Sequence, residues 1–147
     1  MIPVAINIIN TSNNPLPRYE TAGAAGADIR ANLTEMLELK PMERAAVPTG
    51  LFIELPEGYE AQIRPRSGLA VRQGITCLNS PGTIDSDYRG EIKVVLINLS
   101  AEPQSIQPGD RIAQMVVQKV ERGEFNIVSH LTTTERNREG FGSTGKN

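Results

Sequence analysis

Cysteine, histidine and aromatic residues are scarce in this chain. Its 147 residues include one cysteine, one histidine, three tyrosines, three phenylalanines and no tryptophan. A single cysteine, Cys77, cannot form a disulfide within the chain, so we expect a reducing compartment. Its apolar neighbours favour a small buried hydrophobe over a nucleophile. The lone His130 has no neighbours that would complete a metal cluster or a catalytic triad, which argues against both kinds of site.

An excess of charge and long apolar runs are also missing. The formal net charge of -2 argues against broad, charge-driven binding to nucleic acid or to anionic membranes. No apolar run approaches the roughly 20 residues that a membrane-spanning helix needs. The first ten residues, MIPVAINIIN, lack a basic region and a cleavage site, so they predict a strand and not a signal peptide. We therefore expect a cytoplasmic protein with no nucleic-acid or membrane partner.

Short period-two segments separated by turns predict an all-β fold. Thirteen glycines and ten prolines punctuate the chain, and apolar residues alternate over 51–55 and 59–63 on either side of the turn PEG. This arrangement predicts a hairpin. Further strands are predicted over 91–100 and 111–120, and SGLAVRQ after Pro65 predicts one short helix. Many short strands without alternating helices indicate a β sandwich or barrel.

The C-terminal stretch has a different character. From about Thr132 it is polar, rich in glycine and without apolar periodicity, so we divide the chain into a core over 1–131 and a flexible arm over 132–147. The arm includes Gly140 to Lys146, which fits the pattern G-x-x-x-x-G-K of a P-loop. A P-loop also needs a serine or threonine after the lysine and a helix behind it. Asn147 stands at that position and no helix is expected, so the P-loop interpretation fails.

Two stretches could bind anions or metals. Asp28 follows small residues in AGADIRA, and on this stretch alone a turn aspartate is the simpler interpretation. In RPRSGLA, Ser67 is a good candidate N-cap for the short helix, and Gly68 opens its first turn. The helix end and the neighbouring Arg66 together suit an anion such as phosphate. An ordinary capped helix is an equally simple interpretation of this stretch.

Two further stretches carry polar residues where a plain sandwich needs none. In GTIDSDYRGEI, Asp85 and Asp87 point to the same face if the segment is a strand, and Tyr88 follows them. A carboxylate pair binds a metal or orients water, although a solvated hairpin tip has the same composition. Gln114 interrupts an otherwise apolar strand, and by itself it indicates only a satisfied polar group.

Taken in order, these five stretches resemble the five motifs of the trimeric deoxyuridine triphosphatases. The resemblance runs from AGADIRA to GFGSTG and covers nearly the whole chain. It implies a distorted β jelly roll, a homotrimer and three active sites at subunit interfaces. It also implies hydrolysis of dUTP to dUMP and pyrophosphate by attack of water at the α-phosphate, with Mg2+ on the triphosphate. Such an activity keeps uracil out of DNA and supplies dUMP for dTMP synthesis.

The resemblance also implies a role for individual residues. Asp85 matches the catalytic acid that orients and deprotonates the attacking water, and Asp28 matches the acid that holds Mg2+ through coordinated water. Asn79 starts the hairpin that reads uracil, Tyr88 packs on the deoxyribose, and Phe141 covers the uracil ring. The matched phosphate-binding residues are Arg66, Ser67, Gly68, Gln114, Arg136, Ser143 and Thr144.

One departure from the family pattern lies in the arm. The family reads Arg-Gly-x-Gly-Gly-Phe where this chain has Arg136-Asn137-Arg138-Glu139-Gly140-Phe141. Two flexible glycines are lost and Glu139 brings a negative charge towards a triphosphate.

Two alternatives stay open at this stage: the related dCTP deaminase fold, which ammonia release would reveal, and a non-catalytic module that binds nucleotide without releasing pyrophosphate.

Overall fold

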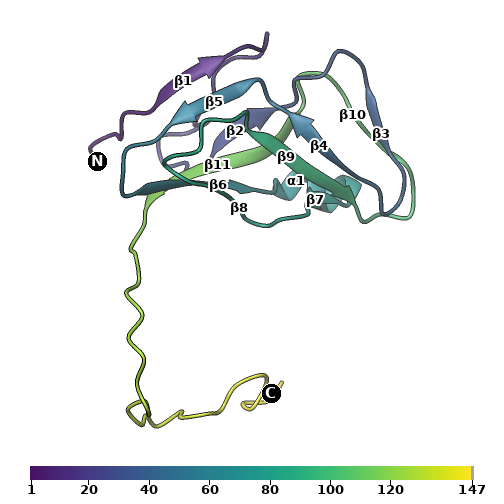
Figure 1. Ribbon diagram of the computed structural model, residues 1–147. Helices are drawn as coiled ribbons and strands as arrows, with labels where there is room; N and C mark the ends of the chain where they lie inside the picture. The colour runs from purple at the N-terminus through teal and green to yellow at the C-terminus, as the bar shows by residue number, and fades with distance from the viewer. Residues whose placement is uncertain (147) are drawn as a thin grey trace.

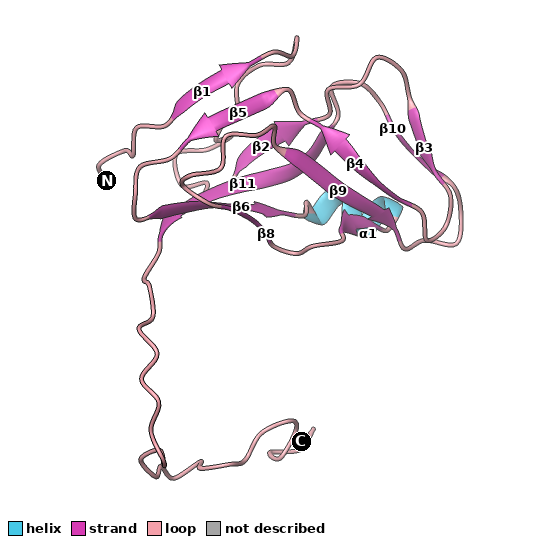
Figure 2. Cartoon of the chain, in the orientation of Figure 1, coloured by secondary structure: helices cyan, strands magenta, loops and turns pink. Residues whose placement is uncertain are grey.

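The protein is an all-β domain with one short helix, as the sequence predicts. The computed structural model describes residues 1–146, and Figure 2 shows their strands and helix. The elements are β1 (Asn7–Asn10), β2 (Ala27–Arg30), β3 (Leu37–Leu39), β4 (Arg44–Pro48), β5 (Leu51–Glu54), β6 (Tyr59–Arg64), α1 (Ser67–Gln73), β7 (Ile75–Cys77), β8 (Gly82–Ile84), β9 (Lys93–Asn98), β10 (Gln104–Ile106) and β11 (Arg111–Lys119).

The strands form two main sheets and two smaller pairs. A four-stranded sheet has the order β2-β11-β6-β8, and a three-stranded sheet has the order β4-β9-β7. The pairs β1–β5 and β3–β10 lie on opposite sides of the molecule in Figure 1. Every strand pairing is antiparallel and most join strands distant in sequence. This arrangement is the jelly-roll type of sandwich that the resemblance implies.

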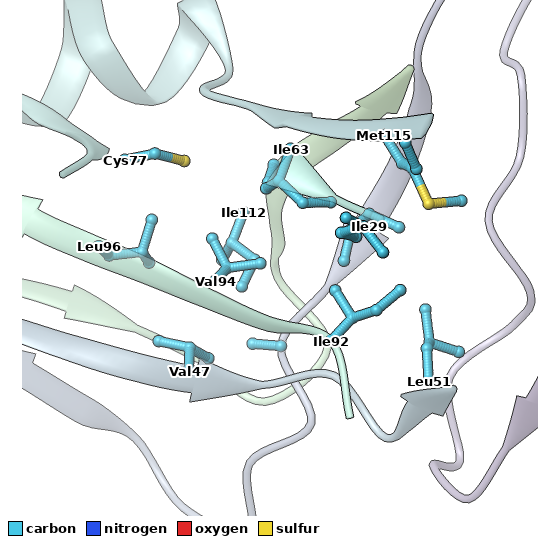
Figure 3. Close-up of a cluster of buried hydrophobic side chains, with 14 of the residues drawn as sticks. Ile29, Val47, Leu51, Ile63, Cys77, Ile92, Val94, Leu96, Ile112 and Met115 are labelled. Atoms are coloured by element: carbon cyan, nitrogen blue, oxygen red, sulfur yellow. The ribbon is translucent and has the colours of Figure 1, made fainter. Parts of the chain in front are cut away.

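The apolar core lies between the two main sheets. Ile29 of β2 and Ile63 of β6 face Val94 and Leu96 of β9, and Figure 3 shows these side chains packed together. Ile29 and Leu96 are fully buried. Cys77 belongs to the same cluster, and its burial raises the pKa of the thiol to about 11. The burial of this cysteine, expected from its neighbours, is therefore confirmed.

The predicted hairpin around the PEG turn is wrong in its pairing. Alternation placed the correct side chains inside, because Leu51, Ile53, Ala61 and Ile63 are all buried. However, β5 pairs with β1, whereas β6 pairs with β8 and β11. The turn therefore carries the chain from one sheet to another. Period-two alternation reports which face of a strand is buried and carries no information about its partner.

The chain leaves the sandwich after β11. Residues 120–146 contain no strand or helix, and Figure 1 shows the end of the chain, which includes the arm, running away from the body. Their side chains are exposed almost throughout. The division of the chain at Leu131 stays a prediction. Within the described residues, no helix is long and apolar enough to cross a bilayer.

Candidate active site in two half-sites

Asp28 lies in a strand and not in a turn, so the simpler interpretation of AGADIRA is wrong. Its neighbours Ala27 and Ile29 point into the core, so Asp28 points to the outer face of the four-stranded sheet. It is nonetheless only 7% exposed. Two arginines cover it: Arg66 Nε lies 3.4 Å from Oδ1, and Arg111 Nη1 lies 3.3 Å from Oδ2. A buried carboxylate needs such partners, because desolvating an unpaired charge is costly.

Arg66 comes from the loop between β6 and α1. Besides contacting Asp28, its Nη1 donates to the backbone carbonyl of Arg111 at 3.3 Å. The predicted N-cap role of Ser67 is wrong, because Arg66 occupies the N-cap position and no side chain caps the helix. Arg66 has an extended backbone, and its carbonyl accepts the first helical hydrogen bond, from Ala70 N. Ser67 is therefore the first helical residue, and its hydroxyl is exposed and free for a ligand.

Gln114 reaches the same carboxylate from β11. Its Nε2 donates to Asp28 Oδ1 at 3.4 Å, across the register pair Gln114–Asp28. The amide that interrupts an apolar strand therefore belongs to a polar cluster on the outer face. Gly26 makes room for it, because a Cβ at residue 26 would lie 3.0 Å from Gln114 Cβ. The structure thus brings together Asp28, Arg66 and Gln114, which the motifs singled out.

Arg111 completes this cluster, and the sequence analysis missed it. The available signal was a basic residue directly after the turn QPGD, at the start of the strand that carries Gln114. Nothing in that position distinguishes it from any solvent-facing arginine. With Asp28 as its one acid, the group of Asp28, Arg66 and Arg111 has a net positive charge. We name these three residues and Gln114 the cationic half-site; its charge and its donors suit an anion such as a phosphate chain.

A second half-site surrounds the turn after β8. Asn79, Asp85 and Tyr88 line one hollow of about 520 Å3 next to β8 and β9. Tyr88 is fixed there, because its hydroxyl donates to the carbonyl of Glu91 at 2.9 Å. Asn79 packs against Gly82, where a Cβ would lie 3.2 Å from Asn79 Nδ2. We name Asn79, Asp85 and Tyr88 the turn half-site.

The two acids of the turn do not share a strand face, contrary to the prediction. Strand β8 ends at Ile84, and the chain then turns, with Tyr88 N donating to Asp85 O at 3.1 Å. Asp85 and Asp87 nevertheless line a common depression of about 860 Å3 beside the β5–β6 turn. Asp85 lines both hollows, so it is the one of the two acids that shares a hollow with Asn79 and Tyr88.

Within one chain the two half-sites are far apart. Ile84 pairs with Ala61, so Asp85 lies beside Glu60 at one end of β6. Arg66 follows the other end of β6. The six residue-to-residue steps from Glu60 to Arg66 span about 20 Å at roughly 3.3 Å per step. Within one chain, Asp85 and Arg66 therefore lie near opposite ends of β6.

The arm residues contact neither half-site in this structure. Arg136 Nε donates to the carbonyl of Glu139 within its own turn at 2.8 Å. Phe141 is fully exposed, and Ser143 and Thr144 are exposed as well. Asn137 has φ +50°, so asparagine, which tolerates the left-handed region, keeps there a conformation that glycine adopts freely. Their roles in binding stay predictions.

The residues around Asp28 suit a magnesium ion that arrives with a phosphate chain. No group of three or more His, Cys, Asp or Glu side chains among the described residues could enclose a metal ion. Mg2+ binds nucleotides through one or two carboxylates, water and the phosphates themselves, without an all-protein cage. Asp28, a single carboxylate beside a cationic surface for phosphates, fits an ion that arrives on a triphosphate and does not fit a free ion.

Comparison with known proteins identifies the family. The family model described as dUTPase matches residues 12–145. Deoxyuridine 5'-triphosphate nucleotidohydrolase of Cytophaga hutchinsonii is 62% identical over 142 residues, covering 97% of this chain and 92% of that protein. The protein of the same name from Fusobacterium nucleatum is 55% identical over 146 residues, covering 99% and 100%.

Solved structures agree on the fold. A mutant dUTPase of Staphylococcus bacteriophage 80alpha with dUpNHpp superimposes with a TM-score of 0.87 at 24% identity, covering 96% of this chain and 98% of that one. The phage phi11 enzyme of S. aureus, described with a structural Mg(II) ion, gives a TM-score of 0.78 at 21% identity, covering 88% and 99%. The jelly roll, the two half-sites and the match over residues 12–145 lead to one conclusion: this chain belongs to the dUTPase family.

Proposed function

We propose that this protein hydrolyses dUTP to dUMP and pyrophosphate, and that water attacks the α-phosphate. The observation that carries the proposal is the pair of half-sites with complementary chemistry, in a chain 62% identical to a named dUTP nucleotidohydrolase. One half-site suits phosphates, and the other presents a carboxylate beside a hollow. Attack of water on the α-phosphate, which breaks the anhydride bond to the β-phosphate, requires this division.

The cationic half-site binds the triphosphate. Arg66 and Gln114 provide donors, and the hydroxyl of Ser67 and the backbone of Gly68 lie beside Arg66 at the start of α1. Phosphoryl transfer depends on positioning and on neutralising charge, so fixed guanidinium and amide donors lower its barrier. Bound Mg2+ would add Lewis-acid neutralisation of the phosphates, with Asp28 holding its water shell. Removing magnesium with a chelator should therefore abolish most of the turnover.

The turn half-site provides the chemistry and the recognition. Asp85 is exposed and at the edge of the hollow, where its carboxylate can orient one water and accept its proton. Asn79 lies where hydrogen bonds to uracil would be made. The Tyr88 ring, fixed through its hydroxyl on Glu91, excludes a 2′-hydroxyl from the deoxyribose position. UTP is therefore rejected through its 2′-hydroxyl. Rejection of dTTP requires a rigid pocket around the base, because a loose apolar pocket discriminates one methyl by only about 1–3 kcal/mol.

A complete site needs more than one chain. The separation of about 20 Å between Asp85 and Arg66 along β6 supports sites formed at subunit interfaces, as in a homotrimer. The arm extends away from the body of its own chain (Figure 1), which supports a contact with another chain. We propose that Arg136, Ser143 and Thr144 contact the phosphates and that Phe141 covers uracil when the arm closes.

The test is release of pyrophosphate by the purified protein from dUTP, dTTP, dCTP and UTP, with ammonia measured in parallel. We expect pyrophosphate from dUTP and hardly any from the other three. Equal rates on all four nucleotides would contradict the specificity. Ammonia from dCTP would indicate the deaminase alternative, and binding of dUTP without pyrophosphate would indicate a non-catalytic module. The cytoplasmic location stays a prediction.

A further inference from the structure

The ladder between β2 and β11 contains a bulge next to the cationic half-site. Arg111 pairs with Arg30 and Ala113 pairs with Ile29, which leaves Ile112 as an extra residue on β11. Ile112 is 1% exposed and Ala113 is fully buried, so two consecutive side chains point into the core. Regular alternation from Ala113 would send Arg111 into the core as well. The bulge instead turns Arg111 to the outer face, a use of bulges that is common beside active sites.

On that face Arg111 makes two contacts within the cationic half-site. Its Nη1 lies 3.3 Å from Asp28 Oδ2, and its carbonyl accepts a hydrogen bond from Arg66 Nη1 at 3.3 Å. Asp28 Oδ1 in turn faces Arg66 Nε at 3.4 Å. The Asp28 side chain is 6% exposed, whereas that of Arg111 is 41% exposed. Both oxygens of Asp28 therefore contact an arginine. Arg66 is held by two contacts, one with the carbonyl of Arg111 and one with Asp28, which Arg111 also contacts.

We propose that Arg111 is a positioning residue for the reaction. It fixes the carboxylate of Asp28, and through this carboxylate it fixes the guanidinium of Arg66 towards the phosphates. The proposal rests on the proposed function, because it is the triphosphate that Arg66 must meet. Without Arg111, Asp28 keeps Arg66 as its one cationic partner, so Arg66 is drawn onto Asp28 and away from the substrate. A buried carboxylate that loses one partner depends more on the partner that remains, because an uncompensated buried charge is costly.

Arg30 is the matched control. It lies directly opposite Arg111 in the same ladder, and its Nη1 donates to the carbonyl of Gly109 at 2.9 Å. Arg30 thus has the same charge, the same strand pair and a hydrogen bond to the turn before β11, without an ion pair to Asp28. Replacing either arginine removes a cation from this ladder, whereas only the replacement of Arg111 removes the contact with Asp28.

The experiment compares steady-state dUTP hydrolysis by the wild type, Arg111→Met, Arg111→Lys and Arg30→Met. We expect Arg111→Met to lower kcat about tenfold and to change KM less than about twofold, because a charge-assisted hydrogen bond of about 1.4 kcal/mol is lost from an aligning contact. Arg111→Lys should restore part of the lost kcat, because lysine keeps the positive charge but lacks the planar guanidinium with its paired donors. Arg30→Met should stay within about twofold of the wild type. Rates are expressed per folded protein, from urea unfolding of each variant.

A double-mutant cycle with Asp28→Asn separates positioning from direct contact. If Arg111 acts through Asp28, Arg111→Met should cost less than about twofold in the Asp28→Asn background. A full tenfold cost in that background means that Arg111 acts on the substrate itself, and it overturns the positioning role. If the wild type is active and Arg111→Met has an unchanged kcat, the positioning role of Arg111 is overturned and the proposed function stands. A wild type that releases no pyrophosphate from dUTP overturns the proposed function instead.

Discussion

Two inactive variants should restore each other's activity if the site is shared between chains. Arg66→Met removes the cationic half-site's aligning guanidinium, and Asp85→Asn removes the carboxylate at the turn. Along β6 the backbone positions of these residues are about 20 Å apart in one chain, so we expect each complete site to take them from different chains. Each variant alone should lose most of its turnover, because all of its sites carry the same defect.

The size of the rescue follows from random assembly. The two variants are unfolded, mixed in equal amounts and refolded together, so that each position in an oligomer is filled at random. A site works when the chain that supplies Asp85 is the Arg66→Met variant and the chain that supplies Arg66 is the Asp85→Asn variant. Each condition is met half of the time, so about one quarter of the sites should be active in a symmetric oligomer with heterologous interfaces. Pyrophosphate release from dUTP measures this fraction.

A second mixture serves as the control. The wild type is refolded with an equal amount of the double variant Arg66→Met/Asp85→Asn. Shared sites again predict about one quarter of the full activity, whereas sites contained in one chain predict about one half. A rescued fraction near zero in the first mixture, together with one half in the second, would refute the separation of the two half-sites between chains.

Three further predictions concern the arm, the core and the cysteine. Ending the chain after Leu131 should leave a folded domain by circular dichroism and lower dUTP turnover strongly, because residues 132–146 are exposed and outside the core; full activity would refute the closing arm. Ile75→Ala should lower the free energy of unfolding in urea by about 2–5 kcal/mol, since Ile75 is fully buried, while the exposed Val71→Ala should change it by less than about 0.5 kcal/mol. Cys77 should resist thiol reagents at neutral pH. Labelling of the folded protein at pH 8 would contradict this resistance. Because burial raises the pKa of the thiol from 9.0 to about 11, the contribution of Cys77 to stability is complete below pH 9 and should be lost as the pH rises towards 11.

The faces of the strands could be predicted from the sequence, and their partners could not. Alternation identified Leu51, Ile53, Ala61 and Ile63 as inward-facing, and all four are buried. The predicted hairpin between these segments does not exist, because each strand pairs with others far away in the chain. Pairing is decided by packing between whole sheets, which a short window of sequence does not contain.

The candidate site was predictable where a residue type is unusual in its setting. Gln114 in an apolar strand and the acids after β8 were noticed for this reason, although each had a simple structural interpretation on its own and only the resemblance implied a role. Arg111 does not, because its orientation depends on the bulge at Ile112, and a bulge leaves no mark in the composition of its strand. Asp28 was assigned to a turn for a related reason: small neighbours suit a turn, but they also suit a strand whose outer face is covered by arginines.

The central claim is attack of water at the α-phosphate of dUTP, with the water oriented by Asp85. The most direct test is a single-turnover reaction of the wild type with dUTP in water labelled with heavy oxygen, followed by mass spectrometry of the products. The account predicts the label in dUMP, unlabelled pyrophosphate, and loss of most of the turnover in Asp85→Asn. Label in the pyrophosphate, release of orthophosphate, or an undiminished Asp85→Asn variant would contradict it.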